Sequence, residues 1–268
     1  MLHPRHWLLP GLLGLGACSS GIAELPPDLE STEAGWRHAA SGIVLLRVEP
    51  GSYVMGSPDW EVDRDGDEPQ RKVSIDEPFL LGETEITVGQ WRRVMNQEPP
   101  LEQTQDDHPV KGVTWYAAQE FVAKLNAEGP GGWRLPTEEE WEYACRAGTT
   151  GPFSFEALTP EVANYRGRSP YAGGEKGLDR GDVIPVKSFA PNPWGFYDMH
   201  GNVWEWCEDV YLVHPGRTRV PTEPGASRTM RGGAFTSKGK QLRSAYRDGY
   251  PPQSTGPKYG FRVARSLD

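Results

Sequence analysis

The chain has 268 residues, of which 37% are hydrophobic and 24% are charged, and its formal net charge is -9 at pH 7. This size and composition suit one main folded domain and exclude wholesale disorder, while 32 glycines and 25 prolines predict many loops and short regular elements. The acidic balance, without clustered Lys and Arg along the sequence, excludes a nucleic-acid-binding protein.

The first 17 residues have the three parts of an export signal. Arg5 lies near the start, an apolar run covers residues 7–15, and Gly16 and Ala17 are small. The apolar run is shorter than the roughly 20 residues that a membrane-spanning helix needs. We therefore expect residues 1–17 to be a signal peptide that is removed on export.

The tetrapeptide Leu15-Gly16-Ala17-Cys18 resembles a bacterial lipobox, in which the cysteine becomes the lipidated first residue of the mature chain. A plain secretory signal with an incidental cysteine is the alternative. Ser19 follows the cysteine, and by resemblance to the usual sorting pattern this favours the outer membrane of a Gram-negative cell, with the domain facing the periplasm. Residues 18–35 are predicted to be the lipidated N-terminus and a polar tether, and residues 36–268 the domain.

Three helices are predicted from their N-terminal caps. Thr87 and Thr137 each begin a capping box, completed three residues later by Gln90 and Glu140. Thr114 begins a third run, in which apolar residues at 118, 121, 122 and 125 recur at helical spacing.

Short apolar runs predict strands at residues 43–48, 73–75, 79–81 and 261–264. From residue 148 to residue 193 the sequence has no periodicity. Such a long stretch within a compact domain is either disordered or held by something other than a sheet, such as bound ions. We favour ions.

Several motifs then match one family in order and spacing. They include Arg134-Leu-Pro-Thr-Glu-Glu-Glu-Trp141, Asp198-Met-His-Gly-Asn-Val-Trp-Glu-Trp206, Met230-Arg-Gly-Gly233 and Gly260-Phe-Arg-Val-Ala264. Together they resemble the formylglycine-generating enzyme, or sulfatase-modifying factor, domain over about residues 43–265. The resemblance implies a single α+β domain with a C-type-lectin-like core, little regular secondary structure and bound calcium.

The segment from residue 198 to residue 205 resembles the family's calcium loop. Calcium takes six to eight oxygen ligands from carboxylates, amides and backbone carbonyls. The resemblance implies that Asp198 and Glu205 are side-chain ligands and that Gly201 and Val203 are carbonyl ligands.

A second calcium site of the family maps to an earlier pair of segments. It would take the side chains of Asn164 and Asp179 and the carbonyls of Tyr165 and Gly181. For both sites the alternative is that Asp and Asn side chains in turns cap their own backbone without a metal. The acidic run at residues 63–68 lacks the spacing of a calcium loop and is expected to be solvated.

The cysteine content excludes the best-known chemistry of the family. The family's oxidase uses two cysteines after the Arg-Gly-Gly motif, because its copper and oxygen chemistry needs thiolate ligands. No cysteine follows Cys207, and Ser237 cannot replace a thiolate as a copper(I) ligand. Copper and formylglycine formation are therefore not expected. Cys145 and Cys207 are expected to be buried free thiols, although a disulfide remains an alternative in an oxidising compartment.

Two functions are compatible with these features. The first is a non-catalytic, calcium-stabilised binding or regulatory module that recognises an envelope protein, a peptide or a glycan. The second is a divergent periplasmic oxidoreductase acting on a protein or siderophore-type substrate, as cysteine-free relatives suggest. Its cleft would hold five residues: Ser237, Arg243, Tyr246, Arg247 and Asp248. The arginines could instead only pair with carboxylates beside the strand at residues 260–262.

Overall fold

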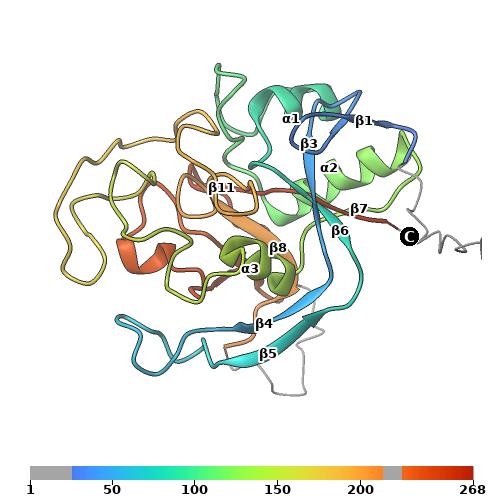
Figure 1. The fold of residues 1–268 in the computed structure, drawn as a ribbon. Coiled ribbons are helices and arrows are strands. Elements are labelled where there is room, and N and C mark those ends of the chain that lie inside the picture. The colour runs from blue at the N-terminus through green and yellow to red at the C-terminus, as the bar shows by residue number, and fades with distance from the viewer. Residues whose placement is uncertain (1–25, 214–224, 268) are drawn as a thin grey trace, which may run out of the picture.

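The computed structural model describes residues 26–213 and 225–267 (Figure 1). The predicted signal peptide and the lipidation site at Cys18 lie outside the described residues and stay predictions. Among the described helices, none is long and apolar enough to cross a membrane.

The described chain consists of short strands and three α-helices that are joined by long irregular segments. The helices are α1 (Val88–Met95), α2 (Trp115–Ala127), α3 (Glu138–Arg146) and the short 3-10 helix η1 (Gly239–Leu242). The strands are β1 (Leu29–Ser31), β2 (Trp36–His38), β3 (Val44–Val48), β4 (Gly51–Met55), β5 (Arg71–Ile75), β6 (Phe79–Gly82), β7 (Trp133–Arg134), β8 (Trp204–Val210), β9 (Arg228–Arg231), β10 (Asp248–Tyr250), β11 (Tyr259–Gly260) and β12 (Ala264–Ser266).

The strands form three sheets. One has six strands in the order β1-β2-β3-β6-β12-β7, one has four in the order β10-β9-β8-β11, and β4 pairs with β5. Strands β8 and β11 pair in parallel. The C-terminal strand β12 lies between β6 and β7, so the two ends of the described chain belong to the same sheet.

The large sheet is covered on both faces. Leu45 and Leu80 pack into a cluster with the apolar sides of α1 and α2, whereas Leu46 and Leu81 pack into a second cluster with α3. Because successive side chains of a strand point to opposite faces, this division follows from strand geometry. A buried sheet between two layers therefore anchors the fold.

All three predicted helices are confirmed. Thr87 and Thr137 are N-caps that complete both halves of their capping boxes, and Thr114 accepts a hydrogen bond from the amide of Ala117. The predicted apolar faces are buried, including Trp91 in α1 and Trp141 in α3. These local signals sufficed because a cap is made within one turn of the helix.

The predicted strands are only partly confirmed. Strands β3, β5 and β6 lie where the apolar runs predict them, but the run at residues 261–264 is wrong as one strand. Residues 261–263 connect β11 to β12 and thus link two different sheets, while their carbonyls accept bonds from the amides of Gly82 and Ile86. A short apolar run alone could not distinguish this crossing from a strand, because all of residues 261–264 are buried.

The predicted tether is too long. Leu29–Ser31 forms β1, which pairs with β2, and Leu29 packs against the core. Asp28 also pairs with the buried Arg265 at 3.0 Å. The folded part of the chain therefore begins before residue 36, because this ion pair and strand pairing involve partners that are distant in sequence.

Residues 148–193 contain no helix or strand, as predicted. Only an isolated bridge between Arg166 and Asp179 interrupts the coil. The segment is nevertheless partly buried, with Phe153 and Tyr165 in a small apolar cluster with Leu242.

Candidate functional site

The segment that follows β9 is packed rather than open. Ser237, at 4% exposure, accepts a hydrogen bond through its Oγ from the amide of Ala234 at 3.0 Å. Tyr246 is also buried, packs against Trp204, and has its pKa raised to about 12 by burial. Asp248 lies in β10 and accepts a bond from the amide of Gly249.

Arg243 is wholly buried between two glutamates. Its Nη1 donates to Glu61 Oε1 and Glu68 Oε2, both at 2.7 Å, and its Nη2 donates to Glu68 Oε1 at 2.7 Å. Burial alone would raise the pKa of Glu68, but the Arg243 charge and hydrogen bonds hold it below its usual value. The prediction of a fully solvated acidic run at residues 63–68 is therefore wrong for Glu68, because its partner is 175 positions away.

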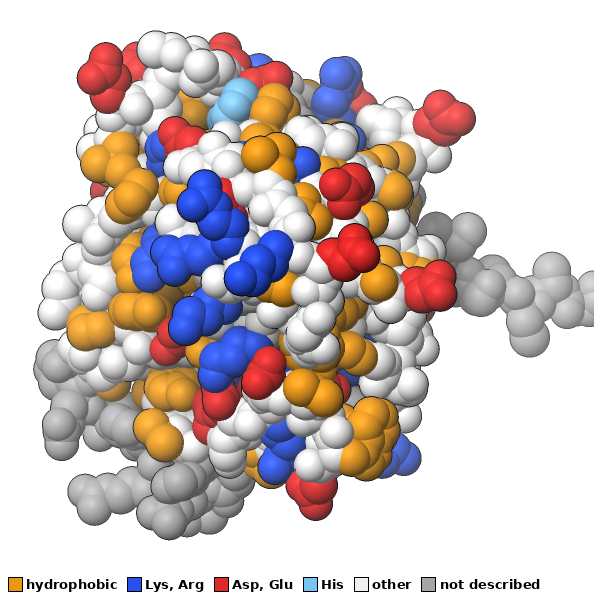
Figure 2. Space-filling view, turned by 90° about the vertical axis from the view of Figure 1, so that its left-hand side faces the viewer, with side chains coloured by type: hydrophobic (Ala, Val, Ile, Leu, Met, Phe, Trp, Pro, Cys, Tyr) orange, Lys and Arg blue, Asp and Glu red, His pale blue; other side chains and the backbone are white. Residues whose placement is uncertain are grey.

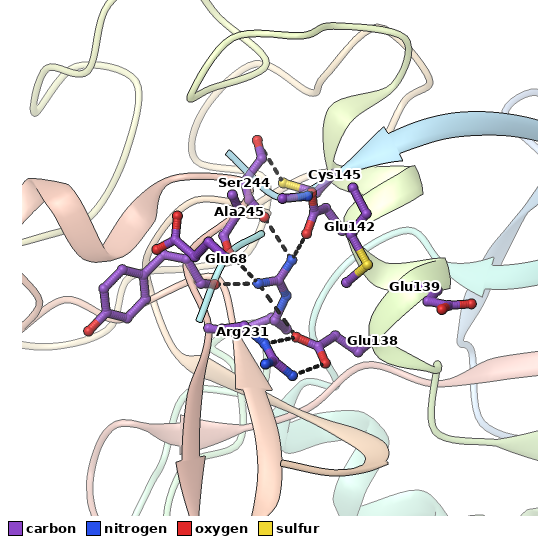
Figure 3. Close-up of polar contacts among 12 residues, drawn as sticks. Glu68, Glu138, Glu139, Glu142, Cys145, Arg231, Ser244 and Ala245 are labelled. Carbon is purple, nitrogen blue, oxygen red and sulfur yellow. Dashed lines mark hydrogen bonds and ion pairs between the residues drawn. The ribbon is translucent and has the colours of Figure 1, made fainter. Parts of the chain in front are cut away.

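Arg231 is the centre of a second buried ion cluster, drawn in Figure 3. It pairs with Glu142 of α3 and donates to the carbonyls of Ser244 and Ala245 at 2.8 and 2.9 Å. Burial alone would lower the pKa of Arg231, but Glu142 and Glu138 hold it above its usual value. The cluster thus joins α3 to β9 and to the segment after η1.

Arg247 extends this cluster. Its Nε and Nη2 donate to the two carboxylate oxygens of Glu138 at 2.7 and 2.5 Å. Burial would raise the pKa of Glu138, but the charges of Arg231 and Arg247 hold it below its usual value. Bidentate pairs of this kind fix both side chains.

These contacts change the expected environment of the cleft residues. Arg243 and Arg247 do pair with carboxylates, but the partners come from residues 61–68 and from α3 and not from beside residues 260–262. Ser237 hydrogen-bonds to backbone instead of facing a reaction space. Ser237 and Arg243 are therefore buried and paired, whereas Arg247 lines a small cavity together with Glu138 and Glu142.

The predicted calcium loop carries one carboxylate that is fully engaged. Glu205 accepts hydrogen bonds from Arg262 Nε and Nη2 at 2.6 and 2.7 Å and from Trp141 Nε1 at 2.7 Å. Asp198 has a positive φ of 58° and accepts a bond from the amide of Lys187 at 2.9 Å through one oxygen. Burial raises the pKa of Asp198 to about 6.

Gly201 lets this loop approach the second predicted site closely. Its φ is +112°, and a Cβ at this position would meet the carbonyl oxygen of Asn164 at 2.4 Å. The amide of Asn202 donates to the same carbonyl at 2.9 Å. The structure therefore places the two predicted calcium segments side by side, and Val203, which was predicted to supply another carbonyl ligand, is buried next to them.

Sequence reasoning missed Glu85, a third carboxylate in this region. It is fully buried and accepts bonds from Asn202 Nδ2 at 2.9 Å and from the amide of Val203 at 3.0 Å. Burial and the charges of Asp198 and Glu205 raise its pKa. The only signal was that Glu85 lies in Glu83-Thr-Glu-Ile-Thr87, a further segment that resembles a motif of the family.

The second predicted site has an unpaired acceptor. Asn164 donates through Nδ2 to the Asp182 carbonyl at 3.0 Å and to Asn202 Oδ1 at 3.1 Å, whereas its buried Oδ1 has no partner among the described residues. Asp179 is engaged with Arg168, and its backbone bridges Arg166, next to Tyr165.

Gly181, predicted as a carbonyl ligand here, has a φ of +79° and sits one residue before Asp182. Of the two predicted side-chain ligands, Asn164 thus offers an unpaired oxygen, whereas Asp179 already has a cationic partner.

Within the described residues, no group of three or more His, Cys, Asp or Glu side chains is arranged to hold a metal ion. A cation at either loop would therefore need amide and backbone carbonyl oxygens in addition to a carboxylate such as that of Asp198, and calcium accepts such ligands whereas softer metals do not favour them. Asn164, Asp198, Asn202 and His200 line one cavity of about 150 Å³.

His200 is a buried neutral side chain. It contacts the Leu242 carbonyl through Nδ1 at 2.7 Å, and its Nε2 accepts a bond from the amide of Ser154 at 3.2 Å. Burial lowers its pKa to about 4.

Both described cysteines are buried free thiols, as expected. Burial raises the pKa of Cys145 to about 12 and raises that of Cys207 as well. Because the thiolate is the reactive form, neither cysteine is poised for redox work.

Residues 31–267 match the family described as Sulfatase-modifying factor enzyme 1-like domain. The formylglycine-generating enzyme of Bos taurus is 28% identical, with 93% of this chain and 86% of that enzyme covered. Chaperone protein LppX of Paenibacillus barcinonensis is 27% identical, with 98% and 99% covered. Serine/threonine-protein kinase pkn1 of Chlamydia caviae is 36% identical, but the match covers 60% of this chain and 24% of the kinase, so the chain spans about a quarter of that relative.

Among solved structures, PvdO from Pseudomonas aeruginosa superposes with a TM-score of 0.75 at 27% identity, covering 91% of this chain and 100% of the other. Together with the few helices and curled sheets described above, this likeness confirms the predicted single α+β domain with a C-type-lectin-like core.

Proposed function

The chain belongs to the family of sulfatase-modifying factor enzyme 1-like domains, and on this premise we propose that it is an envelope lipoprotein whose domain binds a partner without catalysis. The observation that carries the proposal is the packing of the segment after β9. Arg243 and Arg247 are saturated by buried glutamates, and Ser237 bonds to backbone. No cysteine follows Cys207, so the segment also lacks the thiols on which the family's oxidase depends.

One relative supports a binding role. LppX, which matches over nearly the whole of both chains, is named a chaperone protein. By analogy we propose that this domain holds an exported envelope protein, with a glycan as the other candidate. This argument is an analogy between relatives, because one fold can host many functions.

We further propose that calcium stabilises the loops. Glu85, Asp198 and Glu205 are three carboxylates near one buried guanidinium, that of Arg262, and Asn164 Oδ1 is an unpaired buried acceptor. Bound calcium would supply positive charge and fix the irregular backbone. Asp198 and Asn164 are the side chains that we expect to hold it, together with backbone carbonyls, because Glu205 and Asp179 already have cationic partners.

The proposed location is the periplasmic side of the outer membrane, through a lipid on Cys18. A Cys18→Ala variant of the full chain is expected to leave the membrane fraction, because more than one acyl chain is needed for stable anchoring and this variant would carry none. Fractionation of cells that express either form tests this. Equal membrane retention of both forms would contradict the lipid anchor.

The experiment that tests the function compares binding with turnover. In the bacterium that encodes the chain, the gene is deleted, and exported proteins that lose abundance are identified by quantitative mass spectrometry. The full chain, purified in a non-ionic detergent, is then titrated with one of these proteins. A binding module gives a saturable complex at fixed stoichiometry, and the partner keeps its mass.

Turnover would overturn the proposal. If a small amount of the chain changes the mass of a large excess of partner while oxygen is consumed, the domain is an oxidoreductase. As a matched control, Ser237→Ala should restore the deletion strain as well as the original chain does, since Ser237 has no chemical role in a binding module.

A further inference from the structure

One face of this acidic protein carries a group of exposed basic side chains. Figure 2 shows Lys and Arg gathered in the middle of that face. We define the cationic face by five residues from two segments that are about sixty positions apart in the sequence: Arg166, Arg168, Lys176, Lys238 and Lys240. Arg166, Arg168, Lys176 and Lys238 are exposed, and Lys240 is partly exposed.

Backbone hydrogen bonds hold the two segments together. The amide of Arg166 donates to the Ser237 carbonyl at 3.0 Å, and the amide of Gly239 donates to the Ser169 carbonyl at 2.8 Å. A Cβ on Gly239 would lie 2.4 Å from the backbone nitrogen of Tyr171, so only glycine permits this approach. The spacing of the basic groups is therefore a built feature of the fold.

Most of the positive charge on this face is not neutralised. Arg168 pairs with Asp179 at 3.3 Å, and Lys240 pairs with Asp65 at 3.4 Å. For Arg166, Lys176 and Lys238 the structure records no carboxylate oxygen within 4.0 Å among the described residues. Between residues 166 and 178, Glu175 is the one carboxylate, and it is exposed. A chain with a net charge of -9 thus keeps three uncompensated cations on one face.

Apolar side chains accompany these cations. Leu178, at 61% exposure, lies two residues from Lys176, and Val62 is 52% exposed. The Tyr171 hydroxyl donates to the Val62 carbonyl at 3.0 Å, which fixes the loop that carries Val62 beside the cationic face. Mixed basic and apolar groups suit a polypeptide with acidic and apolar side chains better than a bare phosphate.

We propose that the cationic face is the surface that binds an acidic segment of an exported protein, an inference that rests on the binding function proposed above. The position of the cationic face on the domain supports a protein partner. Strand β1, the first element after the proposed lipid anchor, lies on the opposite side of the domain from this face (Figures 1 and 2). The face therefore lies far from the point where the predicted tether joins the domain, which favours a protein over the headgroups of the anchoring membrane.

The test measures binding of three probes to the full chain in non-ionic detergent. They are a labelled peptide of Glu and Leu, the same peptide with Gln in place of Glu, and vesicles of phosphatidylglycerol. We expect the acidic peptide alone to bind, and to bind more weakly as salt screens the charges. Lys176→Glu combined with Lys238→Glu should weaken binding about tenfold. Lys72→Glu, an exposed lysine in β5, is the control and should leave affinity within about twofold.

Three results would overturn the inference. Equal affinity of the double variant and the original chain would mean that the peptide binds elsewhere, and binding of the vesicles in place of the peptide would identify a lipid surface. Failure of all three probes to bind would also contradict the inference. Circular dichroism confirms that the variants are folded. The proposed function is judged separately by the turnover experiment, which uses a native partner and no charge variant.

Discussion

Two clusters of buried carboxylates in this domain differ in their charge balance. Behind β9 lie the Arg243 group and the Arg231 cluster, which we call together the balanced cluster. They contain four glutamates, at positions 61, 68, 138 and 142, and four arginines, at positions 146, 231, 243 and 247. Around the loop at residues 198–205, three carboxylates share Arg262 as their one buried cation among the described residues, and Lys187 near Asp198 is exposed. In a balanced cluster the arginines neutralise the buried carboxylates, whereas the carboxylates of an unbalanced cluster need protons or a bound cation.

The largest effect is expected from breaking the balanced cluster. Glu142→Gln removes the charge that Arg146 and Arg231 share, and an uncompensated buried charge costs about 3–5 kcal/mol of the free energy of unfolding. Urea denaturation measures this loss. The control is Glu139→Gln in the same helix, whose pair with Arg71 is about 40% exposed and should contribute less than about 1 kcal/mol. Similar losses in both variants would mean that the cluster is not the stabilising feature.

Removal of calcium should affect the unbalanced region. A ligand that binds only the folded state adds about 2.7 kcal/mol at a hundredfold excess over its Kd. We expect the melting temperature to fall when a chelator is added and to recover with calcium but not with magnesium. Asp198→Asn retains an oxygen ligand and should reduce this response without abolishing it. An unchanged melting temperature, together with no calcium in elemental analysis, would disprove the calcium assignment.

The close approach of the two loops can be broken at Gly201. In Gly201→Ala the methyl group would meet the Asn164 carbonyl at 2.4 Å, in addition to the strain of a positive φ, so a loss of about 1–3 kcal/mol is expected. Gly173→Ala is a matched control, since Gly173 has a positive φ of +74° but no atom near its Cβ position. Thermal unfolding of both variants should give the larger loss for Gly201→Ala. The reverse order would contradict the packing of the two loops.

The smallest effect concerns pH. Asp209 of β8 accepts a hydrogen bond from the amide of Glu138 at 2.6 Å, and burial raises its pKa to about 6 from the ordinary 3.8. The folded state therefore favours the protonated form. Its contribution to stability is complete below about pH 4 and is lost as the pH rises through 6. In saturating calcium, Asp209→Asn should flatten the dependence of melting temperature on pH between 4 and 7. An unchanged slope would mean that other groups cause this pH dependence.

The balanced cluster could be predicted only in part. The motifs place Arg231 and α3 correctly, but nothing near Glu68 in the sequence indicates that it pairs with Arg243. Glu68 instead stands in an acidic run that is typical of a solvated loop. Its burial follows from a contact between distant segments.

The sequence by itself determined the elements whose signals are local. Thr87, Thr114 and Thr137 cap their helices through atoms within one turn, and the motif order was enough to identify the family and the fold class. It also showed that no cysteine follows Cys207, where the family's oxidase has its pair, because the absence of a residue type can be read without coordinates.

Only the tertiary structure decided which distant groups meet. It brought Asn164 to the loop of Gly201, filled the predicted cleft with ion pairs, and gathered the dispersed basic residues on one face. The physical reason is that burial, ion pairing and close backbone approach depend on contacts between segments, and a single sequence records no such distances.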